Sequence, residues 1–317
     1  MTPAPHIATV TLNASIDQTA SVPNFTAGEV NRVAWDQSDA GGKGVNVASF
    51  LADFGHAIAV TGVLGADNQE LFLHLFAEKG LIDRFVRVRG HTRVNVKVID
   101  DARHQVTDIN FPGVSVGSDD IDAVGAEIEA LVEEGAEVFV LSGSLPAGAA
   151  PTAYRDMTTR LKARGCRVVL DTSGEALVRA IEAAPDAIKP NIDELAELVR
   201  YPLTDEWSIV GAARNLVRRG IGLVAVSMGG RGAIFVTADA AVHAAPPPVR
   251  VRSTVGAGDA MVAGIIHAEL QHHDVEECAR LATAFALGAL GEIGPRLPPR
   301  DVIEAYAHQV TTRRIAA

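Results

Sequence analysis

Short apolar segments rich in β-branched residues alternate with longer helical segments along most of this chain, and this alternation limits the fold more than any other feature. Strand–helix alternation at this spacing predicts a parallel sheet with helices on both faces and right-handed crossovers. We expect buried strands at residues 7–12, 57–62, 137–141, 167–170, 187–189 and 223–227. We expect helices at residues 44–53, 69–78, 119–134, 152–164, 207–219, 260–270 and 275–290, the last two rich in Ala and Gly.

Two segments, residues 20–39 and 93–110, depart from this alternation. Apolar and polar residues alternate over 30–35 and again over 94–99, and such a period without an intervening helix predicts antiparallel strands with one solvated face. We interpret the segments as a small sheet that projects as a lid over a ligand site and offers a dimer surface. An ordinary edge hairpin is the alternative. No repeat or long linker interrupts the sequence, so residues 1–317 are expected to form one domain with this lid inserted.

The charge balance of the 317 residues limits the partners of the protein. Lys and Arg total 28 against 39 Asp and Glu, a net charge of −11. Such a chain has no overall attraction for nucleic acid or an anionic membrane, so an anionic ligand would need a local cationic pocket. The sequence has no run of eighteen apolar residues and no signal-peptide pattern at its start, which predicts a cytoplasmic protein. Cys166 and Cys278 form no CxxC pair and are expected to be buried, reduced thiols.

The segment STVGAGDAMVAG at 253–264 carries the strongest local indication of chemistry. A helix is expected to begin near Ala257, and Gly256 and Gly258 would let its first turn approach a ligand closely. The free N–H groups of that turn, helped by the helix dipole, would bind an anion. Asp259 beside them is a candidate general base for a hydroxyl that attacks a phosphoryl group; the alternative is an acidic residue that only favours the helix start. A dinucleotide-binding turn fits poorly, because the third glycine of GxGxxG is missing.

A second glycine-rich segment, AGGKGVNVA at 40–48, also opens a predicted helix. Its glycines permit close approach to a ligand, Lys43 offers a positive charge, and Asn46 offers a donor and an acceptor. We interpret the segment as a cradle for a hydroxylated substrate, with an ordinary glycine-rich turn as the alternative. A Walker A loop is excluded because Gly44 follows Lys43 where Ser or Thr is required.

One face of a predicted lid strand carries two cationic side chains and one amide, those of Arg93, Lys97 and Asn95. A guanidinium and an ammonium on one face would grip a phosphate, although a solvated strand face has the same pattern.

Asn191 and Glu194 stand three residues apart at a strand-to-helix transition. They would either hold Mg²⁺ through its waters or form an N-cap and its capping-box partner, and the sequence leaves both readings open.

The turn SMGGRG at 227–232 is either a nucleotide contact or a hairpin turn. The ten histidines show no metal-binding spacing.

Together these motifs resemble the PfkB, or ribokinase-like, family of carbohydrate kinases. The resemblance covers nearly the whole chain and rests on Asp17 and the segments GGKGVNVA, KPNIDEL, SMGGRGA and TVGAGD in the family's order. It implies a three-layer α/β/α fold with a mostly parallel central sheet and a small β-sheet lid. Two residues depart from the family pattern: Ala14 stands where relatives usually have Pro, and Ala260 stands where they often have Ser.

The resemblance also implies roles for individual residues. Asp259 would be the catalytic base, with the anion hole at Gly256, Ala257 and Gly258. The sugar phosphate would meet Asp17, Gly41, Gly42, Lys43, Asn46, Arg93, Lys97 and Ser144. ATP would meet Lys189, Asn191, Ser227, Gly229, Gly232 and Thr254, and Mg²⁺ would lie near Asn191 and Glu194, held through water.

Within the family, the segments GEVNRV at 28–33, TRVNVK at 92–97 and SGSLP at 142–146 most resemble members that act on fructose 1-phosphate. The implied activity is ATP- and Mg²⁺-dependent phosphorylation of fructose 1-phosphate at its C6 hydroxyl, giving fructose 1,6-bisphosphate, by a homodimer joined through the lid. Kinases of tagatose 6-phosphate and the minor type of fructose 6-phosphate kinase are the alternatives. A non-catalytic sugar-phosphate sensor is a more remote one.

Overall fold

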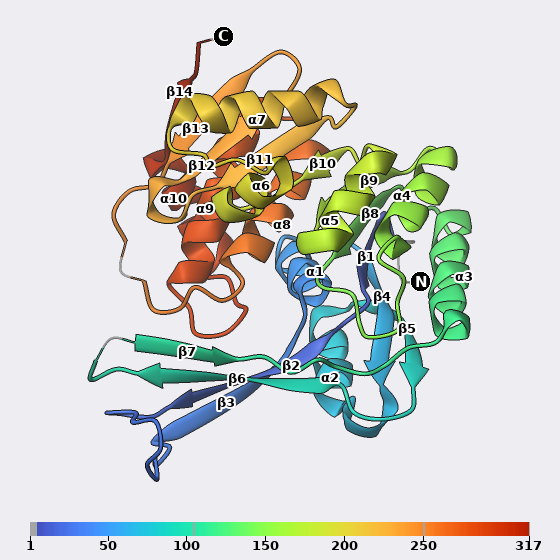
Figure 1. Ribbon diagram of the computed structural model, residues 1–317, viewed down its shortest axis with the longest axis vertical. Helices are drawn as coiled ribbons and strands as arrows, with labels where there is room; N and C mark the ends of the chain where they lie inside the picture. The colour runs from blue at the N-terminus through green and yellow to red at the C-terminus, as the bar shows by residue number, and fades with distance from the viewer. Residues whose placement is uncertain (1–4, 104, 250, 317) are drawn as a thin grey trace.

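The computed structural model describes residues 5–103, 105–249 and 251–316, and these form a central ten-stranded sheet between two layers of helices (Figure 1). The order of the strands in the sheet is β14-β13-β12-β11-β10-β9-β8-β1-β4-β5. Their bounds are β1 (Ile7–Thr11), β4 (Ile58–Gly65), β5 (Ile82–Val88), β8 (Val138–Ser142), β9 (Arg167–Asp171), β10 (Ala187–Ile188), β11 (Leu223–Ser227), β12 (Ala233–Val236), β13 (Ala241–Ala245) and β14 (Thr311–Arg314).

The strands from β5 to β11 in this order all pair in parallel, which confirms the mostly parallel sheet. The strands β12, β13 and β14 then pair antiparallel and extend one edge. Neither this antiparallel edge nor β5 was among the predicted strands.

Helices cover both faces of the sheet. Their bounds are α1 (Lys43–Asp53), α2 (Glu70–Lys79), α3 (Ser118–Glu133), α4 (Ala153–Ala163), α5 (Gly174–Ala180), α6 (Ile192–Val199), α7 (Glu206–Arg218), α8 (Ala257–Leu270), α9 (Val275–Leu290) and α10 (Arg300–Gln309), with short 3-10 helices η1 (Ala66–Asn68), η2 (Ile181–Ala183) and η3 (Gly229–Arg231). The buried side chains form two hydrophobic cores. The first core contains side chains of α1, α2, α8, α9 and α10, and the second core contains those of α3 to α7. In β8, Val140 faces the first core and Phe139 the second, as period-two alternation requires.

A separate four-stranded sheet projects from the main body (Figure 1). Its order is β3-β2-β6-β7, and its strands are β2 (Ser15–Ser21), β3 (Trp35–Gly41), β6 (Arg93–Asp100) and β7 (Gln105–Ile109). The predicted small sheet is therefore confirmed, but two details of the prediction were wrong. The central strands β2 and β6 pair in parallel rather than antiparallel, with Ser15 opposite Arg93. The alternation at 30–35 does not form a strand before Trp35, where β3 begins.

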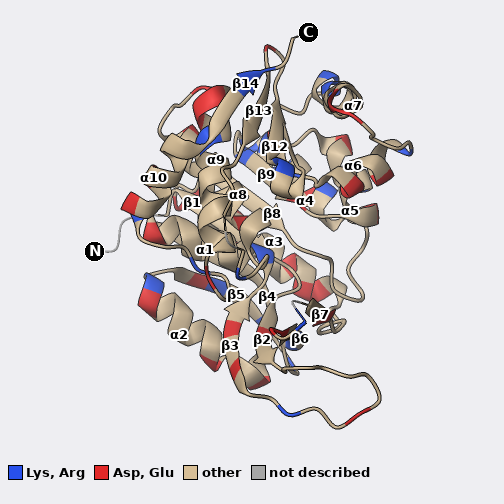
Figure 2. Ribbon diagram, turned by 90° about the vertical axis from the view of Figure 1, so that its left-hand side faces the viewer, with Lys and Arg blue, Asp and Glu red and all other residues tan. Residues whose placement is uncertain are grey.

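Lys and Arg residues and Asp and Glu residues are interspersed along the helices and strands in Figure 2, which agrees with the acidic but mixed composition. Among the described residues, no helix combines the length and the apolar character needed to span a membrane.

Candidate active site

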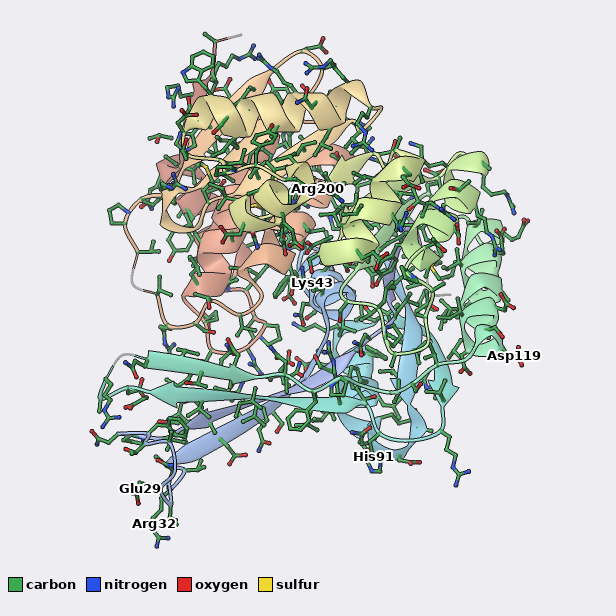
Figure 3. The ribbon with its side chains drawn as sticks, in the orientation of Figure 1. Glu29, Arg32, Lys43, His91, Asp119 and Arg200 are labelled. Carbon is green, nitrogen blue, oxygen red and sulfur yellow. The ribbon has the colours of Figure 1, made fainter. Side chains whose placement is uncertain are left out.

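A cavity of about 370 Å³ lies between the small sheet and the carboxyl ends of the parallel strands. The loops that follow β1, β8 and β9 reach this cavity, and α/β sheets generally bind ligands at this edge. Figure 3 shows Lys43 near the centre of the molecule, at the start of α1. The predicted site residues that line the cavity are Asp17, Gly42, Lys43, Asn46, Arg93, Lys97, Ser144, Gly256 and Asp259.

The helix α8 begins where the sequence predicted. Gly256 is its N-cap and has φ +76°, a left-handed conformation that favours glycine. A Cβ atom on Gly256 would also lie only 3.3 Å from Cζ of Phe50. The N–H groups of the first turn have no partner within the helix and lie at the positive end of its dipole. This geometry suits an anion hole at Gly256, Ala257 and Gly258.

Asp259 lies in this first turn and is only 6% exposed. Nδ2 of Asn46 donates a hydrogen bond to its Oδ2 at 2.7 Å. Burial, together with the nearby negative charge of Asp171, raises the pKa of Asp259 to about 6. The positive charges of Lys43 and Lys189 and the Asn46 hydrogen bond oppose this rise. A carboxylate with a pKa close to neutral pH is suited to act as a general base.

A buried carboxylate that the sequence analysis missed, Asp171, joins the two lysines of the site. Its Oδ1 lies 3.1 Å from Nζ of Lys43 and 3.5 Å from Nζ of Lys189. Burial would raise the pKa of Asp171, but the two lysines hold it below its usual value. Burial would likewise lower the pKa of Lys43, but the surrounding carboxylates raise it above the usual value. By formal charge, the cluster of two lysines and one aspartate is positive.

This positive cluster lies beside the first turn of α8. A Cβ atom on Gly258 would lie 3.3 Å from Nζ of Lys189. The cluster and the helix N-terminus can therefore act together on one anion. A charged residue at the end of the apolar strand β9 was the available signal for Asp171, but a single Asp at a strand end is equally typical of an ordinary turn.

Asp17 is held by two neighbours on the small sheet. Oγ of Ser15 donates to its Oδ1 at 2.8 Å, and Nδ2 of Asn95 donates to the same oxygen at 3.1 Å. A Cβ atom on Gly41 would overlap the Asp17 carboxylate, which explains the glycine at that position although it does not line the cavity. Ser144 accepts a hydrogen bond from Asn13 at 3.0 Å. Asn13 and Ser15 also line the cavity and were missed, because neither belongs to a glycine-rich motif.

Arg93 has a second task that its sequence position did not reveal. Its guanidinium donates to the backbone carbonyl groups of Asn13 at 3.0 Å, Ala14 at 3.3 Å and Phe111 at 3.0 Å. Burial lowers the pKa of Arg93, and the charge of Asp17 offsets part of this effect. Because a guanidinium has five N–H donors, two remain for a phosphate after these contacts.

Lys97 forms an ion pair with Asp108 of the neighbouring strand β7. Both residues line the cavity, so the positive charge of Lys97 is partly balanced there. Arg93 is consequently the stronger candidate for binding a phosphate group on this face.

A second cavity, of about 460 Å³, lies on the other side of the first turn of α8. The predicted ATP contacts Ser227, Gly229, Gly232 and Thr254 all line it, and most of its other lining residues are apolar. Ala257 and Gly258 line this second cavity, whereas Gly256 and Asp259 line the first. The start of α8 thus stands between the two cavities, where a group could pass from a ligand in one to a ligand in the other.

Asn191 and Glu194 form a reciprocal cap at the start of α6. Oδ1 of Asn191 accepts from the Glu194 N–H at 2.8 Å, and Oε2 of Glu194 accepts from the Asn191 N–H at 2.8 Å. The structure therefore supports the capping-box reading for Asn191. Neither residue lines the second cavity, and neither does Lys189, although Asn191 forms a backbone bridge with Ser227. No cluster of three or more His, Cys, Asp or Glu residues arranged to hold a metal occurs in the described part of the chain.

Comparison with known proteins identifies the family of the chain. The family model for pfkB family carbohydrate kinases matches residues 8–301. The 1-phosphofructokinase of Rhodobacter capsulatus is 54% identical over 98% of each chain. That of Xanthomonas campestris is 45% identical over 94% of this chain and 96% of its own. The crystal structure of phosphofructokinase-2 from Escherichia coli in complex with substrates and products has a TM-score of 0.87 and 30% identity, covering 95% of this chain and 98% of that one. The chain belongs to the pfkB family of carbohydrate kinases.

Proposed function

We propose that the protein transfers the γ-phosphoryl group of ATP to the C6 hydroxyl of fructose 1-phosphate, giving fructose 1,6-bisphosphate and ADP. The observation that carries this proposal is the position of Asp259, a buried carboxylic acid residue in the helix turn that separates the two cavities. Similarity to relatives named 1-phosphofructokinase, at 38% to 54% identity, supports the choice of fructose 1-phosphate as the substrate, rather than tagatose 6-phosphate or fructose 6-phosphate.

Each part of the reaction has a candidate in the chain. The sugar phosphate occupies the cavity beside the small sheet, with its phosphate at Arg93 and its ring hydroxyl groups at Asp17. Asp259 accepts the proton of the C6 hydroxyl as its oxygen bonds to the γ-phosphorus and the bond to the leaving ADP oxygen breaks. The first-turn N–H groups of α8, with Lys43 and Lys189, stabilise the negative charge of the transferred group.

The adenine end of ATP occupies the second, largely apolar cavity. A planar, apolar ligand surface is favoured in such a cavity, and the backbone of Gly229 and Gly230 and the side chain of Thr254, which line it, can supply polar contacts.

Glu194 is the better of the two predicted contacts for Mg²⁺. Its Oε2 is used by the cap, and no residue in the described ranges donates to Oε1, so this oxygen fits a water of a hydrated Mg²⁺. Oδ1 of Asn191 is already engaged and does not fit that role. When bound, Mg²⁺ neutralises charge on the ATP phosphates.

The small sheet is the proposed dimer surface. Its loop between β2 and β3 exposes Val30 and Val33, and its last strand exposes Val106 and Ile109. Figure 3 shows Glu29 of the same loop at the far end of the small sheet. Exposed apolar side chains on strands with open edges favour pairing with a second copy. Sedimentation of the protein should show a dimer, and Val30→Asp should shift it toward monomer while Trp207→Gln, on α7 of the main body, should not.

The substrate assignment is tested by coupled ADP release with fructose 1-phosphate, fructose 6-phosphate and tagatose 6-phosphate. Because a misplaced hydroxyl leaves buried polar groups unpaired, we expect kcat/KM to be about one to three orders of magnitude higher for fructose 1-phosphate. A higher value for either 6-phosphate would refute the substrate and leave the kinase assignment standing. No ADP release with any sugar phosphate would favour a non-catalytic sensor instead.

A further inference from the structure

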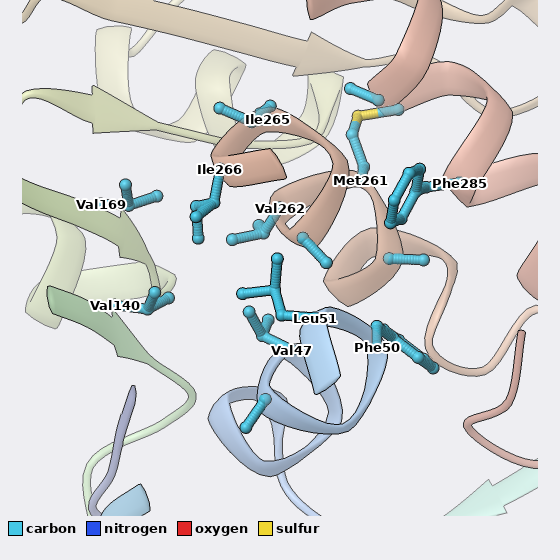
Figure 4. Packing of buried hydrophobic residues seen from close by; sticks show 14 of the residues in the cluster. Val47, Phe50, Leu51, Val140, Val169, Met261, Val262, Ile265, Ile266 and Phe285 are labelled. Atoms are coloured by element: carbon cyan, nitrogen blue, oxygen red, sulfur yellow. The ribbon is translucent and has the colours of Figure 1, made fainter. Parts of the chain in front are cut away.

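Asn46 and Asp259 belong to two helices that both begin at the sugar cavity. Asn46 lies in the first turn of α1, and Asp259 lies in the first turn of α8. The two helices pack closely in the first core, as Figure 4 shows for Val47, Phe50, Leu51, Met261 and Val262. The relative position of the two side chains is therefore fixed by buried packing rather than by a mobile loop.

One hydrogen bond joins the two side chains. Nδ2 of Asn46 lies 2.7 Å from Oδ2 of Asp259, and both residues are buried. The opposite amide orientation would place two acceptor oxygens in contact, so the donor must face the carboxylate. In the described residues the only side-chain donor to Asp259 is this amide, which leaves Oδ1 of Asp259 for the acceptor hydroxyl.

We propose that Asn46 is a positioning residue for the catalytic base, an inference that rests on the proposed function. Its amide fixes the rotation of the Asp259 carboxylate, so that Oδ1 faces the hydroxyl that is to be deprotonated. A base held in this orientation does not have to be oriented anew at each turnover, which preserves the reactive geometry. The sequence analysis assigned Asn46 to sugar binding alone, whereas this role operates through Asp259.

The same hydrogen bond affects the charge of the base. Burial raises the pKa of Asp259, and the donor from Asn46 lowers it by stabilising the ionised form. Loss of the amide should therefore raise this pKa, so that activity would require a higher pH. A residue that only bound the sugar or supported the fold would not produce this displacement.

The test is the dependence of kcat/KM for fructose 1-phosphate on pH in the parent and three variants. In Asn46→Ala a hydrogen bond to a charged group is lost. We therefore expect the acidic limb of the profile, where kcat/KM rises with pH, to move upward by about one pH unit, and kcat to fall about tenfold or more. In Asn46→Asp the limb should move further, because a like charge then contacts the base. The matched control, Ser49→Ala, changes a buried polar residue three positions further along α1 and should keep the parent limb.

An unchanged limb in Asn46→Ala, with only a raised KM, would overturn the inference and leave Asn46 as a sugar contact. The limb reports the active molecules alone, so partial unfolding does not imitate the shift. If a variant is too slow to assay, infrared titration of the Asp259 carboxyl, with its band identified by Asp259→Asn, reads the same shift directly. Substantial activity in Asp259→Asn would instead remove the base assignment of the proposed function, and this inference with it.

Discussion

Burial alone would favour the protonated form of both Asp259 and Asp171, but with the surrounding charges included the pKa values of the two residues shift in opposite directions. Asp259 keeps a pKa raised to about 6, while Lys189 and Lys43 hold the pKa of Asp171 below its usual value. Pairs of carboxyl groups whose surroundings push their pKa values apart commonly divide the acid–base roles of an active site. Here the first suits proton transfer, and the second suits a permanent counter-charge for the lysines.

Removal of this counter-charge should be costly. In Asp171→Asn, the buried ammonium group of Lys189 and the partly exposed one of Lys43 lose the fully buried carboxylate that they share, so we expect the free energy of unfolding to fall by about 3 kcal/mol or more. Asp53→Asn is the matched control, because Asp53 pairs with Lys79 at 2.6 Å in a partly exposed position and should cost at most about 1 kcal/mol. Urea unfolding measures both values, and equal losses would contradict the proposed importance of the buried cluster.

Candidate site residues that belong to a local sequence motif could be predicted from the sequence. Residues whose role depends on contacts with distant parts of the chain could not. Asp259 and Lys43 stand in glycine-rich helix starts, and the structure brings both to one cavity. Asp171 has no such motif, since its importance depends on burial between lysines that are distant in sequence. The three backbone contacts of Arg93 depend likewise on how the small sheet joins the main body.

The helices α1 and α8 are joined at both ends. Their first turns carry Asn46 and Asp259, and near their last turns Nε2 of His56 lies 2.9 Å from Nδ1 of His267. Burial, together with the charges of His56, Arg300 and His273, lowers the pKa of His267 to about 4. Burial also lowers the pKa of His56, together with the charges of Arg300 and His6.

These shifts predict that stability falls in weak acid. Because the folded imidazoles have lower pKa values than the unfolded ones, the unfolded chain binds more protons, and stability is lost as pH falls from about 6.5 toward 4. The variant His267→Gln lacks this titrating group, so its free energy of unfolding should fall less on acidification. After allowance for the partial exposure of His267, we expect the difference from the parent to be about 1 kcal/mol. Urea unfolding at pH 7.5 and 5 measures the difference, and an identical pH dependence in parent and variant would rule out the histidine pair as its source.

Close packing of α8 on α9 gives a second test at the level of elements. A Cβ atom on Gly264 would lie 2.7 Å from Cα of Ala282 and 3.1 Å from Cγ of Phe285, so Gly264→Ala should destabilise the protein by about 1–3 kcal/mol. Gly211 lies within α7 with no atom near its Cβ position, so Gly211→Ala should stabilise it by about 0.5–1 kcal/mol. Thermal unfolding of the two variants should therefore shift in opposite directions, and a shift of the same sign would contradict this account of the packing.

The predicted elements succeeded where the local pattern determines the structure. The buried parallel strands and the long helices were identified because apolar periodicity and helix boundaries are local properties. The parallel pairing of β2 with β6 could not be predicted, because the segments from Ser15 and from Arg93 are separated by two helices and two strands of the main body. The short strands at 233–236 and 241–245 lack strong alternation, and the first follows a glycine-rich turn, so neither was recognised.

In the whole molecule, the site depends on three parts that are distant in the sequence. The small sheet and the loops at the carboxyl edge of the large sheet line the first cavity, which we propose for the sugar phosphate, and the start of α8 separates it from the second cavity. A net charge of −11 would disfavour two anionic substrates, and the lysine cluster and the α8 N-terminus provide the local positive potential that they need.

The central claim is that Asp259 deprotonates the acceptor hydroxyl at the boundary of two substrate cavities. The most direct measurement is single-turnover phosphoryl transfer to fructose 1-phosphate by the parent and by Asp259→Asn, with ATP binding measured calorimetrically on the same samples. We predict unchanged ATP affinity and a rate reduced by about 10²–10⁴-fold, the usual contribution of general-base catalysis. A rate within a few-fold of the parent, at equal ATP affinity, would contradict the account.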